Sequence, residues 1–122
     1  MFNKHTDTRV DTLICGELRT AKEQHGEKFN SLHEAYAVAL EELEEANLNV
    51  ENIKTTFNYF WTAVKSDIKS CFENDLRSTK YYTVEAIKEF AQFAAMIDKT
   101  LESMKIEDAK RENKDIGDAE VL

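Results

Sequence analysis

Proline is absent from this chain of 122 residues, and glycine occurs only three times, as Gly16, Gly26 and Gly117. Average usage would place about six prolines in a chain of this length. Proline and glycine mark turns and strand ends, so their scarcity argues against a β-rich fold with many connections. Ala, Glu, Lys and Leu are abundant instead, and these residues favour helices. The composition therefore predicts an all-α protein with few, short connections.

A basic excess is also missing, because 16 Lys and Arg stand against 24 Asp and Glu, for a net charge of −8. General nucleic-acid binding needs a basic surface, so the composition argues against it. The negative charge fits a cytoplasmic protein, or one that binds cations through clustered carboxylates. It also fits a protein that mimics nucleic-acid charge and blocks a basic partner surface. The charge does not choose among these three.

Cysteine is scarce as well. Cys15 and Cys71 form no C-x-x-C pair and show no metal-ligand spacing. Both occupy apolar positions of predicted helices, so we expect two buried free thiols. No apolar run approaches the roughly 20 residues of a membrane span, and the N-terminus lacks the apolar core of a signal peptide. The sequence predicts a cytoplasmic protein with no membrane association.

Four stretches carry apolar residues at helical spacing, at about residues 8–24, 31–46, 50–76 and 83–105. Gly26 suits a left-handed end to the first helix. Ser31 and Glu34 form a capping box for the second helix, with Phe29 placed to pack back on its first turn. The predicted connections are the asparagine-rich stretch 46–52 and the polar stretch 74–80.

Four amphipathic helices with short connections predict a four-helix bundle, formed by a single domain over residues 1–105. The charged segment 106–122 has no periodicity and is predicted to be a disordered tail. The fourth helix carries a strict a/d seam, which consists of Ile87, Phe90, Ala94, Ile97, Leu101 and Met104. Val38, Phe93 and Met96 lie off the main apolar faces of their helices. Such second apolar faces predict a homodimer or a dimer of dimers.

The second helix also concentrates glutamates. Glu34, Glu41 and Glu45 share one side, with Glu42 on its flank. Like charges three or four residues apart repel, so the cluster carries a mild cost unless a cation or a basic partner offsets it. A solvated acidic face is the plain alternative, and such faces are common.

The fourth helix presents a second oxygen-rich face with Glu85, Glu89 and Gln92. A Gln carbonyl is a neutral acceptor that can stand beside carboxylates. If the two faces meet, the site suits Mg²⁺ or Mn²⁺. Facing helices of a bundle build di-metal carboxylate sites in this way.

These motifs resemble the MazG-like, all-α NTP pyrophosphatase superfamily, whose members carry E-E-x-x-E on one helix and E-x-x-D on a later one. Glu41, Glu42 and Glu45 match the first motif, and Glu89 with Gln92 stands at the second. The stretch 28–46 and the later "EFAQFAAM" also resemble a small phage- and bacterium-associated MazG-like subgroup. The resemblance covers roughly residues 17–46 and 84–101.

The resemblance implies hydrolysis of a nucleoside triphosphate to its monophosphate and pyrophosphate. It implies Glu41, Glu42, Glu45 and Glu89 as catalytic residues, with Glu42, Glu45 and Glu89 as direct Mg²⁺ ligands. Gln92 would bind the metal through its carbonyl, orient a water, or take no part. Glu85 is a further candidate ligand, on our inference from the residues alone, that would restore the charge missing at Gln92.

Two features depart from the family pattern. Gln92 replaces the aspartate of the second motif, and 43 residues (46–88) separate Glu45 from Glu89, more than the family shows. Two other functions therefore stay open. One is a catalytically degenerate protein of this fold that acts in binding or assembly. The other is an acidic, phage-type protein that binds a basic partner.

Overall fold

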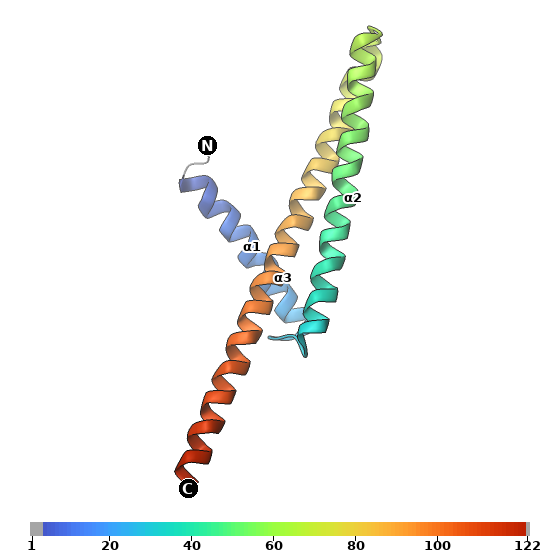
Figure 1. The fold of residues 1–122 in the computed structure, drawn as a ribbon. Helices are drawn as coiled ribbons and strands as arrows, with labels where there is room; N and C mark the ends of the chain where they lie inside the picture. Colours follow the sequence, from blue (N-terminus) through green and yellow to red (C-terminus); the bar gives the residue numbers. More distant parts are fainter. Residues whose placement is uncertain (1–3, 122) are drawn as a thin grey trace. The chain divides into compact units, whose positions relative to one another are not determined.

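The computed structural model describes the backbone of residues 4–121 and the side chains through residue 113. The described chain contains three α-helices: α1 (Lys4–His25), α2 (Leu32–Lys65) and α3 (Phe72–Val121). A short 3₁₀-helix, η1 (Lys69–Cys71), precedes α3, and the described residues contain no strand (Figure 1). The prediction of an all-α fold is confirmed. Among the described residues, no helix has the length and apolar character needed to cross a bilayer.

The predicted breaks between helices are wrong. The asparagine-rich stretch 46–52 lies inside α2, and the polar stretch 74–80 lies inside α3. Asparagine costs a helix only about 0.7 kcal/mol relative to alanine. The apolar spacing of Leu43, Ala46, Val50 and Ile53 continues through the stretch and outweighs that cost. The second and third predicted helices are therefore mostly one helix.

The chain turns instead after Lys65, where Asp67 adopts a left-handed conformation with φ of 53°. The Ile68 N–H donates to the Ala63 carbonyl at 2.9 Å, and the Asp67 N–H donates to the Val64 carbonyl at 3.2 Å. These two bonds form a Schellman motif, which satisfies carbonyls at the end of α2. Glycine is the usual residue at this position of a helix end. Because aspartate stands here instead, the sequence did not predict the turn.

The structure also continues α3 as a helix to Val121, whereas the sequence predicts a disordered tail over 106–122. Ala, Glu, Lys and Arg dominate residues 107–113, and these residues have high helix propensity without any apolar periodicity. The loss of periodicity marks the end of an apolar face here and does not mark the end of the helix.

The described chain divides into two compact units. Residues 4–39 and 94–121 belong to one, the end unit, and Leu40–Phe93 form the other, the hairpin unit. The prediction of one domain over 1–105 stays a prediction. The two units are described separately below.

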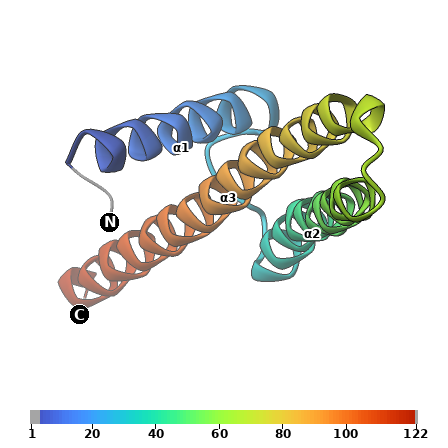
Figure 2. The ribbon, with the colours of Figure 1, turned by 90° about the horizontal axis from the view of Figure 1, so that it is seen from above.

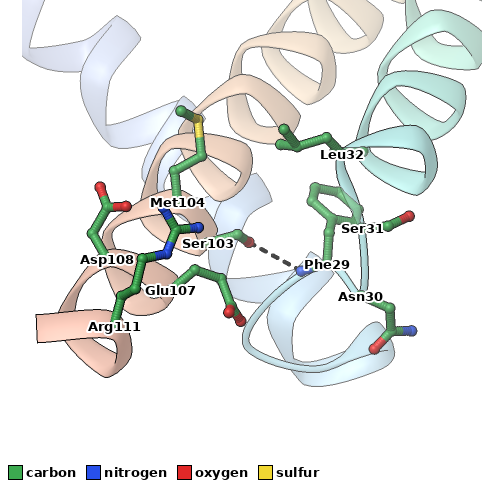
Figure 3. Close-up of a pocket in the computed structure, with 10 residues that line it drawn as sticks. Phe29, Asn30, Ser31, Leu32, Ser103, Met104, Glu107, Asp108 and Arg111 are labelled. Atoms are coloured by element: carbon green, nitrogen blue, oxygen red, sulfur yellow. Dashed lines mark hydrogen bonds between the residues drawn. The ribbon is translucent and has the colours of Figure 1, made fainter. Parts of the chain in front are cut away.

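In the end unit, Phe29 is buried just before α2 begins. Its N–H donates to Ser103 Oγ on α3 at 3.0 Å (Figure 3). The Lys99 ammonium lies 4.3 Å from the centroid of the Phe29 ring. A left-handed Gly26 closes α1, with φ of 93°, as predicted. The Glu34 N–H donates to Ser31 Oγ at 3.1 Å, which confirms Ser31 as the N-cap of α2.

The hairpin unit consists of the antiparallel segments of α2 from Leu40 and of α3 up to Phe93, which lie side by side (Figures 1 and 2). Thr79 Oγ1 donates to Thr56 Oγ1 across the pair at 2.9 Å. The buried apolar side chains of this unit are all alanines: Ala46, Ala63, Ala86 and Ala91. Small side chains let two helices approach closely.

Several side chains predicted to be buried are exposed. Along the α3 seam, the structure exposes Ile87, Phe90, Ile97, Leu101 and Met104. Cys15 and Cys71 are free thiols, as predicted, but both are exposed. The apolar periodicity correctly predicts an apolar face on α3. The pattern does not show what covers that face, and the three described helices offer too few partners to bury every apolar face.

Candidate metal centre

Three glutamates converge in the hairpin unit. Glu42 and Glu45 lie one turn apart on α2, and Glu89 faces them from α3. One carboxylate oxygen from each lies within 4.8 Å of the others. Ligands of a single Mg²⁺, each about 2.1 Å from the ion, lie at most about 4.2 Å apart. Small side-chain adjustments would therefore bring all three oxygens into ligand positions. The meeting of the two acidic faces was a condition of the metal hypothesis, and the structure brings Glu42, Glu45 and Glu89 together.

The electrostatics of this cluster reflect crowded negative charge. A hydrogen bond with Glu89 raises the pKa of Glu45, and burial and the charge of Glu89 raise it further. Burial is the main cause that raises the pKa of Glu89. The hydrogen bond with Glu45 offsets part of this effect, whereas the hydrogen bond with Glu42 and the charges of Glu42 and Glu85 raise the pKa further. Two carboxylates can share a hydrogen bond only by sharing a proton. Without a cation, the pair holds a proton more strongly than free glutamates do.

Gln92 lies beside the same carboxylates. Its amide is assigned with the nitrogen toward them, because in the opposite orientation its oxygen would face only acceptors. So oriented, its amide nitrogen donates to Glu42 Oε2 at 2.7 Å and to Glu89 Oε2 at 3.0 Å. The amide thus stabilises the two carboxylates in place of a cation. Sequence reasoning considered the carbonyl of Gln92 as a ligand and did not consider this donor role.

Two other predicted site residues lie outside the cluster of three. Glu41 is exposed on α2, and its carboxylate does not join the group formed by Glu42, Glu45 and Glu89. Glu85 accepts a hydrogen bond from Lys88 Nζ at 3.1 Å, so part of its charge is already neutralised. Glu85 still acts on the cluster through its charge, which contributes to the raised pKa of Glu89. The spacing of Lys88, three residues after Glu85, was the signal for this ion pair.

The end unit contains a cavity of about 370 Å³ between the start of α2 and the turns of α3 from Ser103 to Arg111 (Figure 3). Phe29, Leu32, Ala35 and Met104 form its apolar walls. Several polar groups on its rim already bond within the chain. The Ser103 hydroxyl accepts a hydrogen bond from the Phe29 N–H, and the Glu107 carboxylate forms an ion pair with the Lys28 ammonium at 2.6 Å. The cavity lacks the converging polar groups that identify a reaction site.

The chain matches no known protein-family model, no curated protein and no solved structure. The chemistry of the centre must therefore be argued from its own donor set. Three carboxylate oxygens from two facing helices are hard ligands, which suit Mg²⁺ or Mn²⁺ rather than softer metals. The raised pKa values of Glu45 and Glu89 agree with this fit, because a cation would relieve the same repulsion.

Proposed function

We propose that this protein is a Mg²⁺- or Mn²⁺-dependent hydrolase that converts nucleoside triphosphates to monophosphates and pyrophosphate, of the MazG-like type. The observation that carries the proposal is the convergence of Glu42, Glu45 and Glu89. Residues from two motifs that 43 intervening residues separate along the chain lie together in the hairpin unit. A solvated acidic face needs no such meeting of two helices.

In this proposal, Glu42, Glu45 and Glu89 hold the divalent ion. When bound, the ion supplies positive charge that neutralises triphosphate oxygens and activates water. A water oxygen adds to phosphorus, the bridging P–O bond between the α- and β-phosphates breaks, and the proton of the water passes to a base. Glu45 is the exposed member of the cluster, so it is the carboxylate best placed to accept that proton.

One observation favours the degenerate alternative, in which the fold serves in binding or assembly. Gln92 donates to two of the three carboxylates, and it removes the negative charge that an aspartate would add. A bound ion must compete with these hydrogen bonds. The amide therefore weakens metal binding relative to an aspartate, although it leaves all three carboxylates in place.

The test is a pyrophosphate-release assay. The purified chain is incubated with a panel of NTPs and dNTPs in Mg²⁺ or Mn²⁺. Turnover that is lost in Glu45→Gln and in Glu89→Gln supports the proposal, since each variant keeps the size of the side chain and removes its charge. Glu44→Gln is the matched control, because Glu44 is exposed on the same helix and occupies a variable position of the first motif.

The outcomes separate the two functions. Absence of turnover across the panel, together with a Mg²⁺-dependent rise in melting temperature, would support the degenerate metal-binding protein. Absence of both would exclude the metal centre. Turnover that survives in both glutamine variants would place the reaction elsewhere on the chain.

A further inference from the structure

Three asparagines lie in the middle of α2, directly after the clustered glutamates: Asn47, Asn49 and Asn52. Asparagine is unfavourable inside a helix, because its side chain prefers caps and turns. Asn47 is exposed, whereas Asn49 and Asn52 are half-buried. Apolar side chains at the two half-buried positions would pack better against the neighbouring helix. The packing of the hairpin unit therefore does not account for these two amides.

Helical geometry places Asn49 and Asn52 on the side of α2 that carries Glu45. One residue corresponds to about 100° of rotation, so Asn49 lies about 40° and Asn52 about 20° from the direction of Glu45. Thr56 lies about 20° from the same direction, and its hydroxyl accepts a hydrogen bond from the Thr79 hydroxyl on α3. The two amides thus lie between two points at which α2 meets α3, the carboxylate cluster and the threonine pair.

Tyr82 occupies the corresponding stretch of α3. It lies between Thr79 and Glu89, which are the residues of α3 at the same two contacts. Seven residues separate its position from that of Glu89, so Tyr82 lies about 20° from the direction of Glu89. Its ring is half-buried and makes an edge contact with Tyr81, at 5.3 Å between centroids. The side of the hairpin that carries the carboxylates therefore continues with two amides and an aromatic ring.

The two side-chain amides are available to a ligand. The backbone carbonyl of Asn52 accepts a hydrogen bond from Thr56 Oγ1 at 3.0 Å. The side chains of Asn49 and Asn52, in contrast, form no hydrogen bond with any residue that the structure describes. An amide offers a donor beside an acceptor. A ligand with the complementary pair can bond to these amides without breaking a bond within the chain.

The distance from the carboxylates suits the nucleoside part of a nucleotide. The rise of 1.5 Å per residue puts Asn49 about 6 Å and Asn52 about 10 Å beyond Glu45 along α2. When an ion at the carboxylates holds the phosphates, the sugar and the base extend away from it over a similar distance. The edge of a base offers donors and acceptors that an asparagine amide can pair with, and its face stacks on aromatic rings.

We propose that Asn49, Asn52 and Tyr82 bind the nucleobase of the triphosphate, so that the protein selects among nucleotides by the hydrogen-bonding edge of the base. The two amides pair with that edge, and the ring of Tyr82 lies against the face of the base. This inference rests on the proposed function, because the phosphates at the metal centre determine where the base lies. All three residues lie outside residues 17–46 and 84–101, the stretches that resemble the MazG-like superfamily.

The experiment is isothermal titration calorimetry of the full chain in Mg²⁺. The probes are the α,β-methylene analogues of ATP, GTP, CTP and UTP, which resist cleavage between the α- and β-phosphates, and inorganic tripolyphosphate, which has no base. We expect the analogues to differ from one another in affinity. The preferred analogue should bind at least about tenfold more tightly than tripolyphosphate.

Asn49→Ala and Asn52→Ala should each weaken binding of the preferred analogue by about tenfold, as the loss of one or two hydrogen bonds does. Both should leave the affinity for tripolyphosphate unchanged. Asn47→Ala is the matched control, because Asn47 is exposed and lies about 160° from the direction of Glu45. Alanine favours a helix more than asparagine does, so these variants should fold. Tyr82→Leu should weaken all four analogues, because stacking does not depend on the edge of the base.

The outcomes separate this inference from the proposed hydrolysis. Equal affinities for all probes would overturn the inference, and so would a preference that both half-buried asparagine variants keep or that Asn47→Ala reduces as much. Pyrophosphate release from NTPs would then still support the hydrolase. A preference that is lost in Asn49→Ala and Asn52→Ala, without any pyrophosphate release, would refute the hydrolysis and leave the base site standing. Absence of binding by every probe would overturn both.

Discussion

Glu89→Gln tests whether the three glutamates form a strained cluster in the absence of metal. At neutral pH the charge of Glu89 repels Glu42 and Glu45, whose oxygens lie within 4.8 Å. Two unit charges 4 Å apart repel by about 1 kcal/mol in water and by about 4 at an effective dielectric of 20. Glu45 is exposed and Glu89 half-buried, so solvent screening favours the lower end. We expect the variant to stabilise the metal-free protein by about 1–2 kcal/mol.

The pH dependence gives the same experiment a second readout. The pKa of Glu45 and that of Glu89 are raised above 4.5 in the folded state. In the window above that value the folded protein holds more protons than the unfolded one, so its stability falls as pH rises. In EDTA, the wild type should therefore melt at a higher temperature near pH 5 than near pH 7. Glu89→Gln should flatten this difference.

The assay is thermal unfolding followed by circular dichroism, with EDTA or Mg²⁺, at both pH values. A gain of 1 kcal/mol corresponds to a rise of about 3–6 °C for a domain of this size. Mg²⁺ should raise the melting temperature of the wild type and of Glu44→Gln, and should leave Glu89→Gln unchanged. A variant that melts lower than the wild type in EDTA at pH 7 would refute the reasoning, because the carboxylate would then be stabilising in its own right.

Two further predictions concern Gln92 and Asp67. Gln92→Asp replaces two donated hydrogen bonds with a fourth negative charge, so it should lower the melting temperature in EDTA and increase the rise that Mg²⁺ produces. Isothermal titration calorimetry should show a Mg²⁺ affinity higher by about tenfold. An unchanged affinity would show that the amide does not compete with the ion. Asp67→Gly places glycine at a φ of 53°, where an L side chain costs roughly 1 kcal/mol. Urea unfolding should therefore show that the free energy of unfolding rises by about 0.5–1 kcal/mol. A fall in the free energy of unfolding would mean that the Asp67 side chain stabilises the turn.

Local signals in the sequence predicted local structure well. Ser31 caps α2 and Gly26 ends α1, because a hydroxyl N-cap and a left-handed glycine act through their immediate neighbours. The turn at Asp67 was not predicted, because the turn is formed by backbone hydrogen bonds, which the sequence does not show. Aspartate is also more typical of the start of a helix than of its end. The asparagines of 46–52 misled for the opposite reason, because their weak local preference is overridden by a continuous apolar line.

Burial was harder to predict, because periodicity shows that a helix has an apolar face and does not show what covers it. Phe90 and Ala86 are four residues apart on α3, yet Ala86 is 5% exposed and Phe90 is 42% exposed. Two helices in close contact exclude large side chains from the contact line, so alanine is buried between them and phenylalanine is displaced to the side. Side-chain hydrophobicity alone would predict the opposite, with Phe90 more buried than Ala86.

The candidate site shows the same limit at the level of single atoms. Helical spacing was enough to place Glu42 and Glu45 near one another on one helix and Glu89 on an oxygen-rich face of another, but it left open whether the two faces meet. The role of Gln92 depends on which end of its amide faces the carboxylates, and an amide offers both a donor and an acceptor. The charge around it decides that orientation. Beside three carboxylates, the nitrogen is the end assigned to face the cluster. Beside a divalent ion bound to the same oxygens, the carbonyl would gain a partner. We therefore expect the orientation of the Gln92 amide to report whether the site holds a metal.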